Sequence, residues 1–360
     1  MLDSPVARVL TVFGTRPEAI KLAPVLAAIE GHPRLSSLVC ISSQHRDLLP
    51  PLLDHFGVLP RHDLDVMRTD QTLAELTARV LTGVAGVIEQ ESPDVVVVHG
   101  DTTTTLAASL AAFYAGVPIA HVEAGLRTAD LRTPFPEELN RRLTDRIAAV
   151  HYAPTETAAE RLRAEGATDV LVTGNTGIDA LLRSIRPGVV PRRSVLVTCH
   201  RREVLGERLV GICRALAEIP RRHPGFGVLY PVHPNPTVRR TVHEVLDGVP
   251  GVTLCEPMAY PAFVRALQAC HLVLTDSGGL QEEAPSLDKP VLVMRDVTER
   301  TEGIETGALR LVGTEPSRIL AALDEVLGDR EVYDRMASAE NPYGDGRAAE
   351  RIVDDLALRF

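Results

Sequence analysis

Apolar and polar positions alternate between two kinds of segment along most of the chain. Short apolar runs of strand length are followed by longer segments in which apolar residues recur at helical spacing. The four valines at 95–98 are too few for a helix and too apolar for an exposed strand, so they predict a buried parallel strand. Through about residue 173 this alternation predicts a mostly parallel, doubly wound α/β sheet.

Two carboxylates follow neighbouring apolar runs in the middle of this first region. Asp101 comes after the valine strand and before an Ala- and Leu-rich helix that either Asp101 or Thr102 can cap. Glu123 follows the next apolar run, at 117–121. Ligands of open α/β sheets bind beyond the carboxyl ends of the strands. We therefore expect Asp101 and Glu123 at one crevice.

The alternation restarts after a segment rich in proline, glycine and charge at 186–194, which is typical of an interdomain linker. We expect a first domain of residues 1–173 plus a C-terminal helix at 346–360, and a second domain of residues 174–345. The two halves share one strand–helix plan. This predicts two Rossmann-like, doubly wound α/β domains facing a central cleft.

Two strand-to-helix turns are candidates for binding an anion. Arg16 and Lys21 lie beside a predicted helix start, where two cations are unfavourable unless an anion lies between them; an ordinary turn is the alternative. Ser277, Gly278 and Gly279 follow an apolar strand, and their backbone N–H groups can cradle phosphate. The turn is neither a G-x-G-x-x-G fingerprint nor a P-loop, so nicotinamide binding gains no support.

Composition narrows the class of protein. The chain has 360 residues, which favours two domains, and a net charge of −10, which argues against nucleic acid or an anionic membrane as a partner. Its five cysteines are scattered and suggest neither a disulfide framework nor a zinc site. No apolar run reaches the ~18 residues of a membrane span, and no signal-peptide pattern opens the sequence. A cytoplasmic enzyme is expected.

The candidate chemistry is proton transfer on a phosphate-bearing substrate. Asp101, Glu123 and Glu137 supply carboxylates for acid and base roles, and His200 follows a strand of the second half. Glu137 opens a helix, so a purely structural role at the helix dipole is an equal alternative. Metal binding is disfavoured because no H-x-x-x-H or D-x-D spacing occurs, and Ser277 lacks a nucleophile elbow. We expect no cofactor.

Eight motifs cover nearly the whole chain. They are FGTRPEAIK (13–21), HGDTTTTLAASLAAF (99–113), HVEAGLRT (121–128), PFPEELNR (134–141), TGNTGIDAL (173–181), HRRE (200–203), YPVHPNP (230–236) and TDSGGLQEEAPSLDKPVLVMRD (275–296). In content and order they resemble the non-hydrolysing UDP-N-acetylglucosamine 2-epimerases of bacteria. The resemblance implies a glycosyltransferase-B type fold and interconversion of UDP-GlcNAc and UDP-ManNAc, by elimination of UDP to a 2-acetamidoglucal and readdition, without NAD or metal.

The resemblance also implies roles for individual residues. It makes Asp101, Glu123 and Glu137 the acid–base carboxylates, leaving open which face of C2 each serves, and makes His200 the residue that assists the leaving diphosphate. Substrate binding is implied for Arg16, Lys21, Arg141, His233, Phe263, Ser277, Gly278, Gly279 and Glu283. A homodimer and a product used for cell-surface polysaccharide are the family's usual properties.

Bacterial members of this family often have a second UDP-GlcNAc site through which substrate activates the enzyme. Gln44 and Gln71, which the resemblance associates with that site, are both present. Asp47 and Asp70 stand where some relatives carry Gln and Arg. Because a carboxylate repels a diphosphate, we predict weak or absent substrate activation.

Four other functions are compatible with the same architecture. A hydrolysing epimerase would release ManNAc and UDP from the same intermediate, and an epimerase of a related UDP-hexosamine would differ only in its sugar. A glycosyltransferase is disfavoured because three clustered carboxylates exceed what sugar transfer needs. A catalytically silent UDP-sugar sensor is disfavoured because all three carboxylates and His200 are present.

Overall fold

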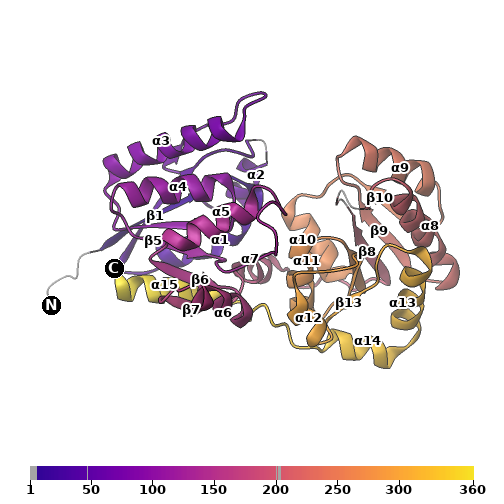
Figure 1. The fold of residues 1–360 in the computed structure, drawn as a ribbon. Helices are drawn as coiled ribbons and strands as arrows, with labels where there is room; N and C mark the ends of the chain where they lie inside the picture. The colour runs from indigo at the N-terminus through magenta and orange to yellow at the C-terminus, as the bar shows by residue number, and fades with distance from the viewer. Residues whose placement is uncertain (1–5, 47, 200, 202–203) are drawn as a thin grey trace. The chain divides into compact units, whose positions relative to one another are not determined.

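Two parallel sheets flanked by helices make up the described part of the chain, which in this computed structural model is residues 6–46, 48–199, 201 and 204–360 (Figure 1). The first unit holds the described residues through Arg183 together with Tyr343–Phe360, and the second is Ser184–Pro342. The doubly wound α/β architecture expected from the alternating pattern is confirmed in both units.

The first unit contains a seven-stranded sheet in the order β3-β2-β1-β4-β5-β6-β7, with every pairing parallel. Its strands are β1 (Ala7–Phe13), β2 (Leu35–Ile41), β3 (His62–Asp63), β4 (Val95–His99), β5 (Ile119–Val122), β6 (Val150–Ala153) and β7 (Val170–Val172). The strand order reverses between β1 and β4. The turns after these two strands therefore lie at the point where open sheets bind ligands.

Helices connect these strands, and their apolar faces cover the sheet. They are α1 (Arg16–Glu30), α2 (Pro50–Phe56), α3 (Leu73–Glu91), α4 (Thr103–Tyr114), α5 (Glu137–Ile147), α6 (Glu156–Ala164), α7 (Thr176–Ser184) and α15 (Ala348–Arg359). The four valines of β4 are fully buried, as a central strand covered on both faces requires. This rigid centre positions the residues that follow β4.

The C-terminal helix α15 belongs to the first unit (Figure 1, yellow). Asp179 in α7 accepts hydrogen bonds from the backbone N–H groups of Ala348 and Ala349, and Arg351 donates to the carbonyl of Thr173. These bonds fasten α7 and α15 together. The division of the chain consequently falls after residue 183, whereas the sequence pattern placed it after residue 173.

The second unit contains a six-stranded parallel sheet in the order β10-β9-β8-β11-β12-β13. Its strands are β8 (Ser194–Thr198), β9 (Gly227–Pro231), β10 (Val252–Cys255), β11 (Leu272–Thr275), β12 (Val291–Val293) and β13 (Leu309–Leu311). Its helices are α8 (Glu207–Arg222), α9 (Pro236–Leu246), α10 (Tyr260–Ala269), α11 (Gly278–Glu283), η2 (Ala284–Leu287), α12 (Thr301–Glu305), α13 (Pro316–Gly328) and α14 (Arg330–Ala337). Here the order reverses between β8 and β11, so the turns after those strands occupy the ligand-binding edge.

Two further observations concern the whole described chain. All five cysteines are free thiols, four of them buried. Among the residues described, no helix has the length and apolar character needed to cross a membrane.

Candidate active site

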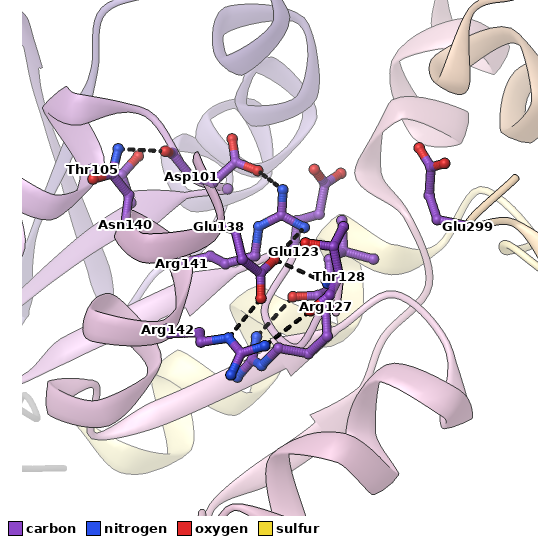
Figure 2. A network of polar contacts seen from close by, with 12 residues as sticks. Asp101, Thr105, Glu123, Arg127, Thr128, Glu138, Asn140, Arg141, Arg142 and Glu299 are labelled. Carbon is purple, nitrogen blue, oxygen red and sulfur yellow. Dashed lines mark hydrogen bonds and ion pairs between the residues drawn. The ribbon is translucent and has the colours of Figure 1, made fainter. Parts of the chain in front are cut away.

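Asp101 lies in the turn between β4 and α4. Thr102 caps α4 by accepting a hydrogen bond from the backbone N–H of Thr105, so the carboxylate of Asp101 is left for other contacts. The Arg141 guanidinium lies 2.6 Å from that carboxylate, and the Asn140 amide donates to the Asp101 carbonyl at 2.9 Å (Figure 2). Helix α5 thus holds both the backbone and the side chain of Asp101.

The surroundings of Asp101 favour its protonated form. Burial is the largest cause that raises the pKa of its carboxyl group, and the negative charges of Glu123 and Glu137 raise it further. The cations Arg141 and Lys21 oppose this rise without cancelling it. A carboxyl group that retains its proton more readily than usual is suited to act as a general acid.

Glu123 follows β5 and carries the second carboxylate of the site. Its backbone φ is +62°, a left-handed conformation that a non-glycine residue adopts at a cost in free energy. The Lys21 ammonium from α1 forms an ion pair with the Glu123 carboxylate, and each side chain is 14% exposed. This cation stabilises the ionised form of Glu123, as a general base requires.

His99 is the last residue of β4 and lies against Glu123. Its Nε2 is 3.7 Å from the nearer carboxylate oxygen, and within the described residues neither ring nitrogen has a hydrogen-bond partner. Burial lowers the pKa of His99 to about 4, although the charge of Glu123 opposes the shift. The imidazole is therefore neutral near pH 7. The sequence offers no separate signal for this residue, because its position is simply the end of an apolar strand.

Glu138, which sequence reasoning missed as a site residue, anchors the first turn of α5. Its carboxylate is fully buried, lies 2.6 Å from Arg142 Nε and 3.6 Å from Arg141, and accepts from the backbone N–H of Thr128 at 3.0 Å (Figure 2). Its neighbour Glu137 is half-buried and adds negative charge near Asp101. Glu138 orients Arg141, while Glu137 contributes to the charge of the site.

Glu18 links the turn after β1 to the turn after β4. Its carboxylate accepts from the backbone N–H groups of Gly14 and Thr15 at 3.1 and 2.8 Å, and from the Thr102 hydroxyl at 2.8 Å. Burial raises its pKa, while these hydrogen bonds lower it. The backbone N–H of Arg16 donates to His45 at 3.2 Å. The turn carrying Arg16 is thus fixed to the turn carrying Asp101.

In the second unit, the predicted phosphate cradle lies after β11 and forms the start of α11, with Ser277 at the N-cap and Gly278 and Gly279 in the first turn. The backbone N–H of Ser277 donates to the Thr275 hydroxyl at 2.9 Å. A Cβ atom on Gly278 would lie 2.7 Å from the guanidinium carbon of Arg300, which shows how closely that cation approaches the glycine backbone. Arg300 is held in turn by Glu282 at 2.9 Å. A cation over a glycine turn is a favourable setting for an anion.

The remaining candidates of the second unit are dispersed around the same sheet. Glu283 ends α11, and one of its carboxylate oxygens is 3.8 Å from the position of a Cβ on Gly279. His233 follows β9 and accepts from the backbone N–H of Asn235 at 3.2 Å, and Phe263 is half-buried in α10. His200 lies outside the described residues.

The two glutamines associated with a second site lie in the first unit. Gln44 accepts from the Thr104 hydroxyl at 3.2 Å, and Gln71 accepts from Arg79 at 2.5 Å. Asp47 lies outside the described residues. The structure therefore gathers Asp101, Glu123, Lys21 and Arg141 into one group, and it places the glutamines in separate contacts.

The architecture and these side chains define an α/β enzyme built from two Rossmann-like units, one with two carboxylates each paired with a cation and one with a glycine turn beside a cation. A family model described as UDP-N-acetylglucosamine 2-epimerase matches residues 27–357. The chain belongs to the UDP-N-acetylglucosamine 2-epimerase family.

Individual relatives are similar over nearly their full length. A probable UDP-N-acetylglucosamine 2-epimerase of Ralstonia nicotianae is 50% identical, with 98% of this chain and 99% of the relative covered. The UDP-N-acetylglucosamine 2-epimerase of Escherichia coli (strain K12) is 48% identical, with 97% and 98% covered. A crystal structure of the Neisseria meningitidis enzyme bound to UDP-GlcNAc has a TM-score of 0.89 and 44% identity, with 98% and 100% covered.

Proposed function

We propose that this protein reversibly epimerises UDP-GlcNAc to UDP-ManNAc at C2 of the sugar. The observation that carries the proposal is the pair of carboxylates, Asp101 and Glu123, each in contact with its own cation at the ends of adjacent strands. The family membership supports the substrate, because the Neisseria relative was crystallised with UDP-GlcNAc.

The proposed reaction eliminates UDP across C1–C2 to give a 2-acetamidoglucal, and then adds UDP again with a proton delivered to the other face of C2. The proton at C2 is weakly acidic, so departure of UDP leads or accompanies its removal. Glu123, paired with Lys21, is suited to accept a proton, and Asp101, whose pKa is raised mainly by burial, is suited to deliver one. Glu137 completes the acid–base group.

The leaving diphosphate needs positive charge and backbone N–H groups. In this proposal Arg16, Ser277, Gly278 and Gly279 bind the diphosphate, and His200 assists its departure. Glu283 binds the ribose hydroxyls, and Phe263 packs near the uracil. The substrate-binding roles of Lys21, Arg141 and His233 belong to the same proposal, although Lys21 and Arg141 contact catalytic carboxylates in this structure.

Proton NMR of the enzyme with UDP-GlcNAc in D₂O tests the proposal directly. We expect UDP-ManNAc with deuterium at C2, and no free sugar, because protonation from the active site introduces solvent deuterium while UDP is retained. Release of free ManNAc and UDP would instead identify a hydrolysing epimerase. If UDP-GlcNAc is unchanged but another UDP-hexosamine exchanges its C2 proton, the substrate assignment is wrong and the site assignment stands.

A homodimer, a cytoplasmic location and a product used in cell-surface polysaccharide are further parts of the proposal. The dimer is supported by apolar side chains exposed at the end of α4 and along α5: Phe113, Tyr114, Leu139 and Leu143 are between 39% and 73% exposed. Light scattering after size exclusion is expected to give twice the chain mass. A single-chain mass at micromolar concentration would contradict the dimer.

A further inference from the structure

Three buried side chains form a network of polar contacts behind the loops that carry Asp101 and Glu123. His121 lies in β5, Asp145 in α5, and Arg127 in the segment between them. Nδ1 of His121 is 2.6 Å from one carboxylate oxygen of Asp145, and the Arg127 guanidinium is 2.7 Å from the other. The side chains of His121, Asp145 and Arg127 are 0%, 3% and 8% exposed.

The hydrogen-bond partners determine where the protons of His121 lie. Nε2 is 2.7 Å from the carbonyl oxygen of Gly100, which can only accept, so Nε2 carries a hydrogen. The second oxygen of Asp145 accepts from Arg127 and from the backbone N–H of Gly125 at 3.3 Å, as an ionised carboxylate does. The first oxygen then accepts from Nδ1. His121 thus joins the Gly100 carbonyl to the Asp145 carboxylate.

The neighbouring ionisable groups favour an ionised Asp145 carboxylate. Burial alone would raise the pKa of Asp145, but His121 and Arg127 outweigh burial and hold that pKa below its usual value. His99, at the end of β4, interacts electrostatically with His121. His151 is the residue of β6 that pairs with His121 in the sheet register. Asp145 is therefore the anion at the centre of this group, in contact with both His121 and Arg127.

The same ion pair reaches the backbone on both sides of the site. His121 binds the carbonyl of Gly100, the residue before Asp101, and Asp145 binds the N–H of Gly125, two residues after Glu123. Gly100 and Glu123 both adopt left-handed backbone conformations, with φ of +65° and +62°. Such conformations persist when the surrounding structure fixes them.

We infer that His121 and Asp145 are positioning residues: their hydrogen bonds to Gly100 and Gly125 hold the loops that carry Asp101 and Glu123 in place for C2 epimerisation. The catalytic part of this inference rests on the proposed function. The hydrogen bonds of His121 and Asp145 do not, and they are measured separately.

The hydrogen bonds are tested without activity by amide hydrogen exchange of the wild type and Asp145→Asn, followed by NMR. Because the Asp145 carboxylate accepts from the Gly125 N–H, we expect that amide to exchange about 10-fold faster in Asp145→Asn. Unchanged exchange at Gly125 would overturn the inference whether or not the protein is an epimerase.

The positioning role is tested by kinetics of His121→Gln, because glutamine cannot place polar atoms where both Nδ1 and Nε2 of His121 lie. Since small displacements of reacting groups are costly, we expect kcat to fall about 10- to 100-fold and KM for UDP-GlcNAc to change less than about threefold. Asp145→Asn should lower kcat similarly, and the double variant should lose no more than about the worse single variant, because the pair acts as a unit.

His62→Gln is the matched control. His62 lies 2.9 Å from Glu91, which also pairs with Arg8 and Arg61, so it too is a histidine in a network of arginine and carboxylate, but in the edge strand β3. Its kcat is expected to stay near the wild-type value. Equal losses of kcat in His62→Gln and His121→Gln at matched melting temperatures would overturn the positioning role. An inactive wild type would instead contradict the proposed function, with the hydrogen-exchange result unaffected.

Discussion

The Arg141 guanidinium and the Asp101 carboxylate lie 2.6 Å apart, and this contact opposes the burial that raises the pKa of Asp101. Burial raises the affinity of Asp101 for a proton, while the Arg141 cation limits how far its pKa rises. The protonation state of Asp101, which lies between β4 and α4, therefore depends on Arg141 of α5.

Replacing Arg141 by glutamine is expected to raise the pKa of Asp101 further, because the nearest cation is removed while burial remains. The limb of the pH–rate profile on which Asp101 loses its proton should then move up by about 1 unit or more. The measurement is kcat against pH, followed by NMR. Arg142→Gln is the control, since Arg142 contacts Glu138 and not Asp101, and its profile should match that of the wild type.

The ion pair between Lys21 and Glu123 predicts a separation of stability from activity. Either Lys21→Met or Glu123→Gln leaves a largely buried charge without this partner, so each is expected to lower the free energy of unfolding by about 1–3 kcal/mol. The double variant should recover part of that loss, because no charge is stranded, yet remain inactive. Urea unfolding of all four proteins gives the cycle; additive losses would show that the pair contributes no coupling.

Sequence patterns were sufficient to predict that Asp101 and Glu123 lie near each other, because both follow adjacent, strongly apolar strands of a parallel sheet. They were not sufficient to distinguish Glu137 from Glu138. Neighbouring positions on a helix point about 100° apart, and the preceding prolines leave the orientation of α5 to tertiary packing. Only the structure shows that Glu138 is the buried partner of Arg142.

Other contacts depend on packing between distant segments, which periodicity does not encode. His121 meets Asp145 across 24 positions of sequence, and neither residue stands in a motif whose spacing predicts an ion pair. The pairing of α7 with α15 likewise depends on Asp179, whose carboxylate binds N–H groups 169 and 170 residues away. An anion near Lys21 was expected from its place beside a helix start, and the structure supplies the carboxylate of Glu123.

His99 predicts a specific dependence of stability on pH. Its pKa is about 4 in the folded protein, chiefly because of burial, against about 6.5 when unfolded. As pH falls below about 6.5, His99 takes up a proton in the unfolded chain, whereas in the folded protein it does so only near pH 4. Stability is therefore lost as pH falls from about 6.5 to about 4. From pH 7.5 to pH 5.5, His99 should account for about 1 kcal/mol of lost stability.

The variant His99→Gln removes that proton uptake. Its free energy of unfolding should therefore fall less than that of the wild type between pH 7.5 and pH 5.5, when both are measured by urea unfolding. A larger loss of stability in His99→Gln than in the wild type is not expected. Parallel pH dependences for the two proteins would show that His99 takes up its proton equally in the folded and unfolded states.

The replacement of a cation by Asp70 leads to a prediction about regulation. Asp70 precedes Gln71, whose side-chain amide oxygen accepts a hydrogen bond from Arg79. The carboxylate of Asp70 repels the diphosphate of a second nucleotide sugar. We expect hyperbolic kinetics with UDP-GlcNAc and turnover of UDP-ManNAc without added UDP-GlcNAc. Asp70→Arg should introduce sigmoidal kinetics, whereas Asp54→Arg, which adds the same charge on α2, should not. Sigmoidal kinetics in the wild type, or a requirement for UDP-GlcNAc in the reverse reaction, would show that substrate activation persists despite Asp70.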